Sequence, residues 1–204
     1  MLDAALRKLI DPPLDRAGAA LARLGVSADA VTLFGLLPGG LAVLALSQAR
    51  YDLALACLAL NRLCDGLDGA VARRTKTTDF GGFLDIVGDF LVYAAIPLGF
   101  ALADPAANAI PAAVLMASFF GAGSSFLAFA VIAAKRRIAT DARGRKSFYY
   151  LGGLAEGTET VAVFVAMHLA PDWFPWLAYG FAALCWATAL GRVLQARAMF
   201  RDGA

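Results

Sequence analysis

The sequence predicts an all-α integral membrane protein with six transmembrane helices, an N-terminal amphipathic surface helix and both termini in the cytoplasm. Three observations support this fold class. Of the 204 residues, 60% are hydrophobic and only 17% are charged, less charge than a soluble domain carries. Apolar runs long enough to cross a bilayer recur along the chain, and basic residues gather in alternate connecting segments. We expect a single domain over residues 1–204.

The first 25 residues have an amphipathic pattern. Leu2, Leu6 and Leu9 recur at helical spacing with basic residues between them, and the pattern resumes after Pro12 and Pro13. This predicts an interfacial helix over residues 1–25 on the cytoplasmic face of the membrane. The stretch has charges throughout and no apolar core, so we expect no cleavable signal peptide.

Six spans are expected within residues 27–192, the first of them capped by Ser27. Their predicted ranges are 27–48, 53–73, 82–103, 109–134, 151–170 and 173–192. Basic residues precede the first span, follow the sixth and occupy the second and fourth connections: Arg7, Lys8, Arg16, Arg23; Arg192, Arg197, Arg201; Arg73, Arg74, Lys76; Lys135, Arg136, Arg137, Arg143, Arg145, Lys146. Positive charge favours the cytoplasmic side, which predicts a multi-pass protein of the inner (cytoplasmic) membrane.

Four aspartates interrupt the apolar sequence of the second and third spans. Asp65 and Asp68 are three residues apart, and Asp85 and Asp89 are four apart, so each pair shares one face of a helix. Charged groups inside a bilayer are costly and usually functional. Both pairs are predicted to lie in the cytoplasmic part of the bilayer, on adjacent antiparallel helices. The sequence therefore predicts a single acidic site that faces the cytoplasm.

Carboxylates offer hard oxygen ligands, which select Mg²⁺, Mn²⁺ or Ca²⁺. Two such ions held close together suit phosphoryl transfer. Arg73 follows the first pair of acids and offers a bidentate donor for phosphate oxygens. Asp89 lies deepest from the cytoplasm, and it is the candidate to take a proton from an acceptor hydroxyl. The neighbouring small residues, such as Gly69 and Gly81, leave room for a ligand.

The order of these residues resembles the signature of the CDP-alcohol phosphotransferase family. The matching positions, in two segments of the chain, are Asp65, Asp68, Gly69, Ala72, Arg73, and then Gly81, Asp85, Asp89. The resemblance extends more weakly over the whole chain, including residues 25–32 at the entry to the first span.

The resemblance implies a reaction and a set of roles. An acceptor hydroxyl attacks a CDP-linked alcohol such as CDP-diacylglycerol, and CMP leaves, as in phospholipid biosynthesis. Asp65, Asp68 and Asp85 would bind two ions, Mg²⁺ or Mn²⁺, and Asp89 would be a base, a metal ligand or both. The residues implied to contact the CDP moiety are Gly69, Ala72, Arg73 and Gly81. The implied partners are a small hydroxylated acceptor, membrane lipids and a second copy in a homodimer, and we expect no nucleic acid.

The acceptor side is less defined. Lys135, Glu156 and Glu159 are candidates because they lie around the start of the fifth span. The two acids would repel a phosphorylated acceptor and suit a cationic or neutral one. It is equally consistent with the sequence that they pair within the basic loop, which itself is typical of cytoplasmic loops near anionic lipids.

Alternative functions remain open at this point. CDP-choline or CDP-ethanolamine could be the donor, with a lipid as acceptor. A different class is an ion or proton transporter with buried aspartates, but these acids cluster in one half of the bilayer. A third alternative, a catalytically silent partner, should have lost a motif residue, and none is missing. Cys57, Cys64, Cys185 and His168 are interpreted as packing residues because none has a partner at ligand spacing.

Overall fold

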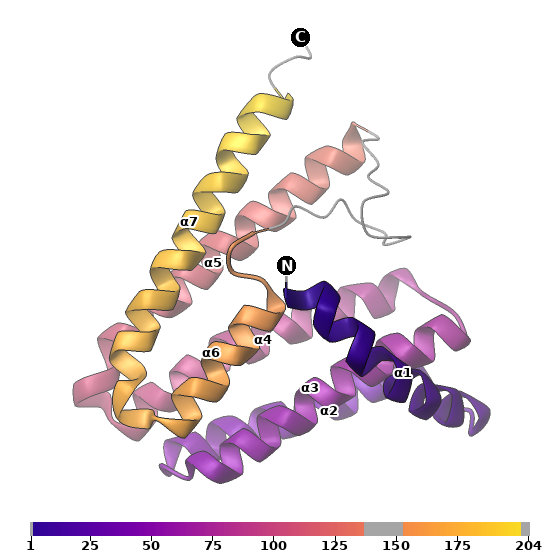
Figure 1. Cartoon of the computed structure of the whole chain (residues 1–204), viewed down its shortest axis with the longest axis horizontal. Coiled ribbons are helices and arrows are strands. Elements are labelled where there is room, and N and C mark those ends of the chain that lie inside the picture. Colours follow the sequence, from indigo (N-terminus) through magenta and orange to yellow (C-terminus); the bar gives the residue numbers. More distant parts are fainter. Residues whose placement is uncertain (1, 137–152, 201–204) are drawn as a thin grey trace.

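The computed structural model describes residues 2–136 and 153–200, with the backbone course alone for residues 2–9. Helices make up most of the described chain, and no strand occurs in it. In order they are α1 (Leu2–Arg23), α2 (Ala28–Ser47), α3 (Tyr51–Arg74), α4 (Asp79–Ala103), α5 (Pro105–Lys135), α6 (Gly157–Leu169), the 3₁₀ helix η1 (Pro171–Trp173) and α7 (Phe174–Phe200). Figure 1 shows long helices in a bundle, with α1 crossing beside α3 and with α5 alongside α7.

Side-chain caps fix where several helices begin. The hydroxyl of Ser27 accepts a hydrogen bond from the Ala30 amide at 3.2 Å, which confirms the predicted cap of α2. The hydroxyl of Thr78 accepts one from the Gly81 amide at 2.9 Å. This cap begins α4 at Asp79 rather than at the expected residue 82.

Helix α6 begins later than the sequence predicted. The fifth span was expected from residue 151, but residues 153–156 are not helical and α6 begins at Gly157. The amides of Leu154 and Ala155 instead donate to the hydroxyl of Thr188 on α7, at 3.1 Å and 3.0 Å. Because these amides have a partner outside the helix, the preceding turn is stable without helical hydrogen bonds.

The N-terminal helix α1 is continuous and includes both Pro12 and Pro13. It packs along α3, where a Cβ on Gly18 would lie 2.7 Å from the Cβ of Ala70. Only a glycine allows this contact, since real Cβ atoms do not approach so closely. The predicted helix over the first 25 residues is therefore present, and it is attached to the bundle.

Within residues 2–136 and 153–200, four helical segments are long and apolar enough to cross a membrane: Ala28–Ser47, Asp79–Ala103, Pro105–Lys135 and Pro171–Phe200. Helix α3 has the length but carries the acids, and α6 has 13 residues, fewer than the roughly 20 of a full span. All six helices expected from the sequence exist near their predicted positions. Four of them meet the composition of a span, so the count of six spans stays a prediction.

An aromatic core fills the end of the bundle away from the acids. Phe100 of α4 stacks on Phe174 of α7 with ring centroids 4.5 Å apart, and both are fully buried. His168 packs its ring edge against Phe100 at 5.3 Å, as expected of a packing residue. Large apolar side chains on the outside, such as Leu37 and Leu44 of α2, are more than half exposed. Such an apolar exterior fits contact with lipid.

Candidate metal centre and active site

Helices α3 and α4 lie on either side of the site because α2 packs against both of them. The approach of α2 to α3 depends on Gly35, where a Cβ would lie 2.8 Å from the Cβ of Cys64. Because α4 begins at Asp79, Asp85 and Asp89 lie about one turn further from its start than expected. The helical spacing still places both on the face toward α3.

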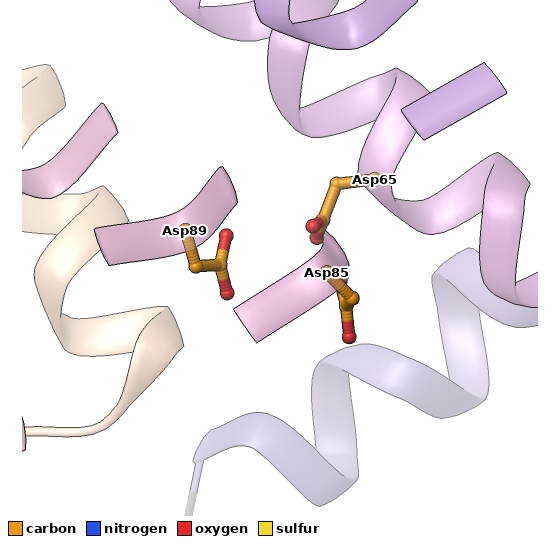
Figure 2. Close-up of side chains that lie close together, drawn as sticks. All are labelled: Asp65, Asp85 and Asp89. Atoms are coloured by element: carbon orange, nitrogen blue, oxygen red, sulfur yellow. The ribbon is translucent and has the colours of Figure 1, made fainter. Parts of the chain in front are cut away.

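Three of the four predicted acids meet in the gap between these helices. Asp65, Asp85 and Asp89 each place one carboxylate oxygen within 4.8 Å of the other two. Figure 2 shows the three side chains close together, with Asp65 coming from one helix and Asp85 and Asp89 from the other. Three carboxylate oxygens at this separation fit a hard divalent cation, which uses oxygen ligands.

Asp68 lies apart from this group of three. It is 6% exposed and accepts a hydrogen bond of 2.5 Å from the hydroxyl of Thr32 on α2. Both residues line the small cavity of about 20 Å³ that the other acids also line. Its role as a metal ligand therefore remains a prediction. Sequence reasoning treated Thr32 only as part of the entry to the first span and missed this contact.

In the described part of the chain, two larger cavities adjoin the acids. The first cavity, of about 170 Å³, opens on the Asp68 and Asp85 side. Its lining includes three of the four residues expected to contact a CDP group, namely Gly69, Ala72 and Gly81. None of the three has a bulky side chain, so the space beside the carboxylates stays open. The cavity begins where α3 ends and α4 starts.

The fourth of these residues, Arg73, is held elsewhere. Its guanidinium donates a hydrogen bond of 2.9 Å to Asp15 on α1, and its side chain is 52% exposed. It lies four residues after Gly69 on α3, and a Cβ on Gly69 would lie 3.3 Å from an Arg73 Nη atom. Arg73 is thus beside the first cavity, with its guanidinium paired to α1.

A second cavity, of about 270 Å³, lies on the other side of Asp89. It is mainly apolar, and α4, α5, α6 and α7 all contribute to it. The lining residues that matter most here are Asp89, Tyr93, Phe119, Phe126, Glu156 and Arg192. The acids therefore stand between two cavities, and Asp89 borders the second one.

The residues expected around the acceptor are found in different settings. Glu156 and Glu159 form a reciprocal capping box at the start of α6, in which the Glu156 amide donates to Glu159 at 3.2 Å. Glu156 also lines the second cavity. Lys135 is in the last turn of α5. The basic loop residues Arg137, Arg143, Arg145 and Lys146 lie outside the described residues.

Arg62 is the main site residue that sequence reasoning missed. Its Nη1 donates a hydrogen bond of 2.7 Å to an oxygen of Asp89 and lies 3.8 Å from an oxygen of Asp65. The signal was present, because Arg62 precedes Asp65 by three residues and so lies on the same face of α3. The rule that orients the chain counts basic residues in the connecting segments and gives no weight to one inside a span.

The sequence profile of the CDP-alcohol phosphatidyltransferases matches residues 25–193. A relative in Escherichia coli K12, named inner membrane protein YnjF, is 51% identical over 95% of this chain and 94% of its own length. An archaetidylinositol phosphate synthase of Pyrococcus horikoshii is 41% identical, over 48% of this chain and 52% of its own. The chain spans about half the length of this second relative.

Two solved structures have the same fold. Phosphatidylinositol phosphate synthase (PgsA1) of Mycobacterium tuberculosis, with CDP-DAG bound, superposes with a TM-score of 0.71 at 19% identity, over 90% of this chain and 93% of that one. The same enzyme in complex with manganese and citrate gives a TM-score of 0.70 over 88% of this chain and 87% of that one, also at 19% identity. At this identity the likeness concerns the fold.

Proposed function

The chain belongs to the CDP-alcohol phosphatidyltransferase family, and we propose that within this family it transfers a phosphatidyl group from CDP-diacylglycerol to a small hydroxylated acceptor. The family makes the chain a CDP-alcohol phosphotransferase of phospholipid synthesis. In the proposed reaction the acceptor oxygen bonds to the phosphorus that carries the lipid alcohol. The bond from that phosphorus to the bridging oxygen breaks, and CMP leaves with that oxygen.

The observation that carries this proposal is the position of Asp65, Asp85 and Asp89 between two cavities. In-line transfer needs the attacking acceptor oxygen and the leaving CMP on opposite sides of the reacting phosphorus. An ion or proton relay would instead need a polar path through the membrane, whereas the end of the bundle beyond the acids is an aromatic core.

The first cavity is the proposed donor side. The small residues Gly69, Ala72 and Gly81 leave room there for the cytidine and its phosphates. Arg73 lies beside Gly69 and would contact a phosphate oxygen once it exchanges Asp15 for the substrate. We propose that the acid cluster with Asp68 holds two divalent ions, Mg²⁺ or Mn²⁺. The chemistry they would supply is neutralisation of phosphate charge and stabilisation of the leaving group. A manganese complex of PgsA1 supports this proposal.

The second cavity is the proposed acceptor side, because Asp89 borders it. A carboxylate in that place can accept the proton of an acceptor hydroxyl as the new bond to phosphorus forms. Glu156 lines the same cavity and remains a candidate acceptor contact. Lys135 and Glu159 are weaker candidates, since neither lines this cavity.

One observation favours a second candidate function. The second cavity is mostly apolar, with Phe119 and Phe126 in its lining, and a lipid acceptor would fit such a surface. In that reaction the donor would be soluble CDP-choline or CDP-ethanolamine. The bound CDP-DAG of PgsA1 supports the first candidate.

We further propose six membrane spans, with both termini and the acid cluster on the cytoplasmic side. The distribution of basic residues supports this orientation, and the name of the Escherichia coli relative supports an inner-membrane location. A homodimer, as the family resemblance implies, remains a prediction.

A donor and acceptor matrix tests the proposed function. Purified protein in lipid nanodiscs is given Mg²⁺ or Mn²⁺ with radiolabelled CDP-diacylglycerol and, in turn, serine, inositol, inositol phosphate and glycerol 3-phosphate. Parallel reactions contain radiolabelled CDP-choline or CDP-ethanolamine with diacylglycerol. A labelled phospholipid in the first set supports the proposal, and one confined to the second set supports the second candidate. No product in either set from folded protein, with these acceptors, rejects both.

A further inference from the structure

Arg62 lies inside the site rather than at its rim. It is on α3, its side chain is 15% exposed, and its Nη1 is 2.7 Å from an oxygen of Asp89 and 3.8 Å from an oxygen of Asp65. It is therefore in contact with two of the three carboxylates that converge. An arginine guanidinium keeps its proton in proteins, so Arg62 brings a permanent positive charge to these acids.

The guanidinium is also fixed by groups that do not belong to the acid cluster. Its Nε donates a hydrogen bond of 2.9 Å to the side-chain oxygen of Asn61. Asn61 in turn donates to the carbonyl of Gly35 on α2 at 2.8 Å and is 4% exposed. The ring of Tyr93 on α4 lies under the guanidinium, 5.6 Å from it. Three helices thus hold Arg62 in place.

This fixation has a consequence for Asp89. A carboxylate has two oxygens, and the one bonded to Arg62 is directed toward α3 by a donor that cannot easily move. The other oxygen is then restricted to the remaining directions around the same carbon. Mutating a partner that orients a ligating carboxylate in this way typically weakens metal affinity by about 10- to 100-fold.

We propose that Arg62 is a positioning residue, which orients Asp89 so that one of its oxygens would bind a divalent ion together with Asp65 and Asp85. This rests on the proposed function, in which these acids bind metal. Arg62 acts through Asp89, and the Asn61–Gly35 link keeps it in the required place.

If Arg62 had only an electrostatic role, removing it would change metal affinity in the opposite direction. A cation close to the acids also repels an incoming metal ion, by Coulomb's law. If Arg62 only offset the charge of Asp65 and Asp89, its removal would strengthen metal binding. If it orients Asp89, its removal weakens binding even though the site becomes more negative. The sign of the change therefore separates the two roles.

The experiment measures Mn²⁺ binding directly, by the electron paramagnetic resonance signal of free Mn²⁺, with purified protein in nanodiscs and no substrate. Arg62→Gln should raise the Kd for Mn²⁺ by roughly 10- to 100-fold. Asn61→Ala, which removes the anchor and leaves the charge, should raise it by a smaller factor. Arg74→Gln removes an exposed cation from the end of the same helix and should leave the Kd unchanged. An unchanged or lower Kd in Arg62→Gln overturns the proposal.

Arg62→Lys provides the second test if Arg62→Gln is not recovered as a single folded species. Lysine keeps the charge but lacks the forked donors that reach Asn61 and Asp89 together. Positioning predicts weaker Mn²⁺ binding in this variant, whereas a wild-type Kd would overturn it. The proposed function can fail separately, since Arg62 variants with weakened Mn²⁺ binding support positioning even if the wild-type protein releases no CMP from any donor in the matrix.

Discussion

Arg73 at the end of α3 donates a hydrogen bond of 2.9 Å to Asp15 on α1. This contact joins the surface helix to the helix that carries two of the acids. Both side chains are more than a third exposed, at 52% and 38%, so the pair adds little to stability. The pair matters for function because it engages Arg73, the arginine that the family resemblance assigns to the substrate.

Asp15→Asn should leave donor binding unchanged or stronger, because it releases Arg73 for the phosphates. Arg73→Lys should raise the KM for CDP-diacylglycerol by about tenfold, since lysine cannot donate in a bidentate manner. Both are measured as initial rates over a range of donor concentrations at saturating metal. If Asp15→Asn weakens donor binding as much as Arg73→Lys does, the pair is itself the binding conformation and no exchange takes place.

The hydroxyl of Thr32 supports Asp68 with a hydrogen bond of 2.5 Å. Thr32→Val keeps the shape of the side chain but removes the hydrogen bond to the buried Asp68 carboxylate, which is worth about 1.5–3 kcal/mol. We expect kcat to fall by at least tenfold in Thr32→Val and to stay within about threefold of wild type in Thr32→Ser. Equal rates in Val and Ser would show that the hydroxyl has no role in the reaction.

Gly81 keeps the first cavity open at the start of α4. A Cβ there would lie 3.0 Å from an oxygen of Asp29 and 3.0 Å from the hydroxyl of Thr78. Gly81→Ala should therefore raise the KM for the donor, by about tenfold if the contact costs about 1.4 kcal/mol. The matched control is Gly40→Ala on α2, where nothing lies within 4 Å of an added Cβ. Equal KM values in the two variants would contradict a donor role for this cavity.

Glu159 distinguishes helix capping from acceptor binding. Its side chain accepts a hydrogen bond of 3.2 Å from the Glu156 amide, and glutamine can do the same. If its role is capping, Glu159→Gln should keep wild-type rates and thermal stability. Glu159→Ala should lose roughly 1 kcal/mol of stability, seen as a lower Tm. A selective rise in acceptor KM for Glu159→Gln would instead place this acid at the acceptor.

The sequence predicted those features that depend on local pattern. The positions of the helices follow from apolar runs and caps such as Ser27, and the paired spacing of the aspartates placed each pair on one helix face. What it could not predict depends on contacts between distant segments. The late start of α6 follows from hydrogen bonds to Thr188 on α7, and Thr32 meets Asp68 across 36 residues.

Arg62 and Arg73 both have partners that local sequence pattern could not predict. Helical spacing places Arg62 on the same face as Asp65, but it does not predict the hydrogen bond to Asp89, which is 27 residues away in the sequence. Arg73 was assigned by its place in the motif, yet the structure pairs it with Asp15 on another helix. Local pattern identifies which residues share a face, while packing between helices decides which partner each side chain finds.

We propose that the carboxylates of Asp65, Asp85 and Asp89 form a divalent-metal centre for transfer from a CDP-alcohol. The most direct test is metal-dependent release of CMP from CDP-diacylglycerol, in the presence of the acceptor found in the matrix, by wild-type protein and by Asp85→Asn. We expect the wild type to release CMP with Mg²⁺ or Mn²⁺ and to release none after chelation, and we expect folded Asp85→Asn to be at least about 100-fold slower. Release that persists without divalent metal, or at the wild-type rate in Asp85→Asn, would contradict it.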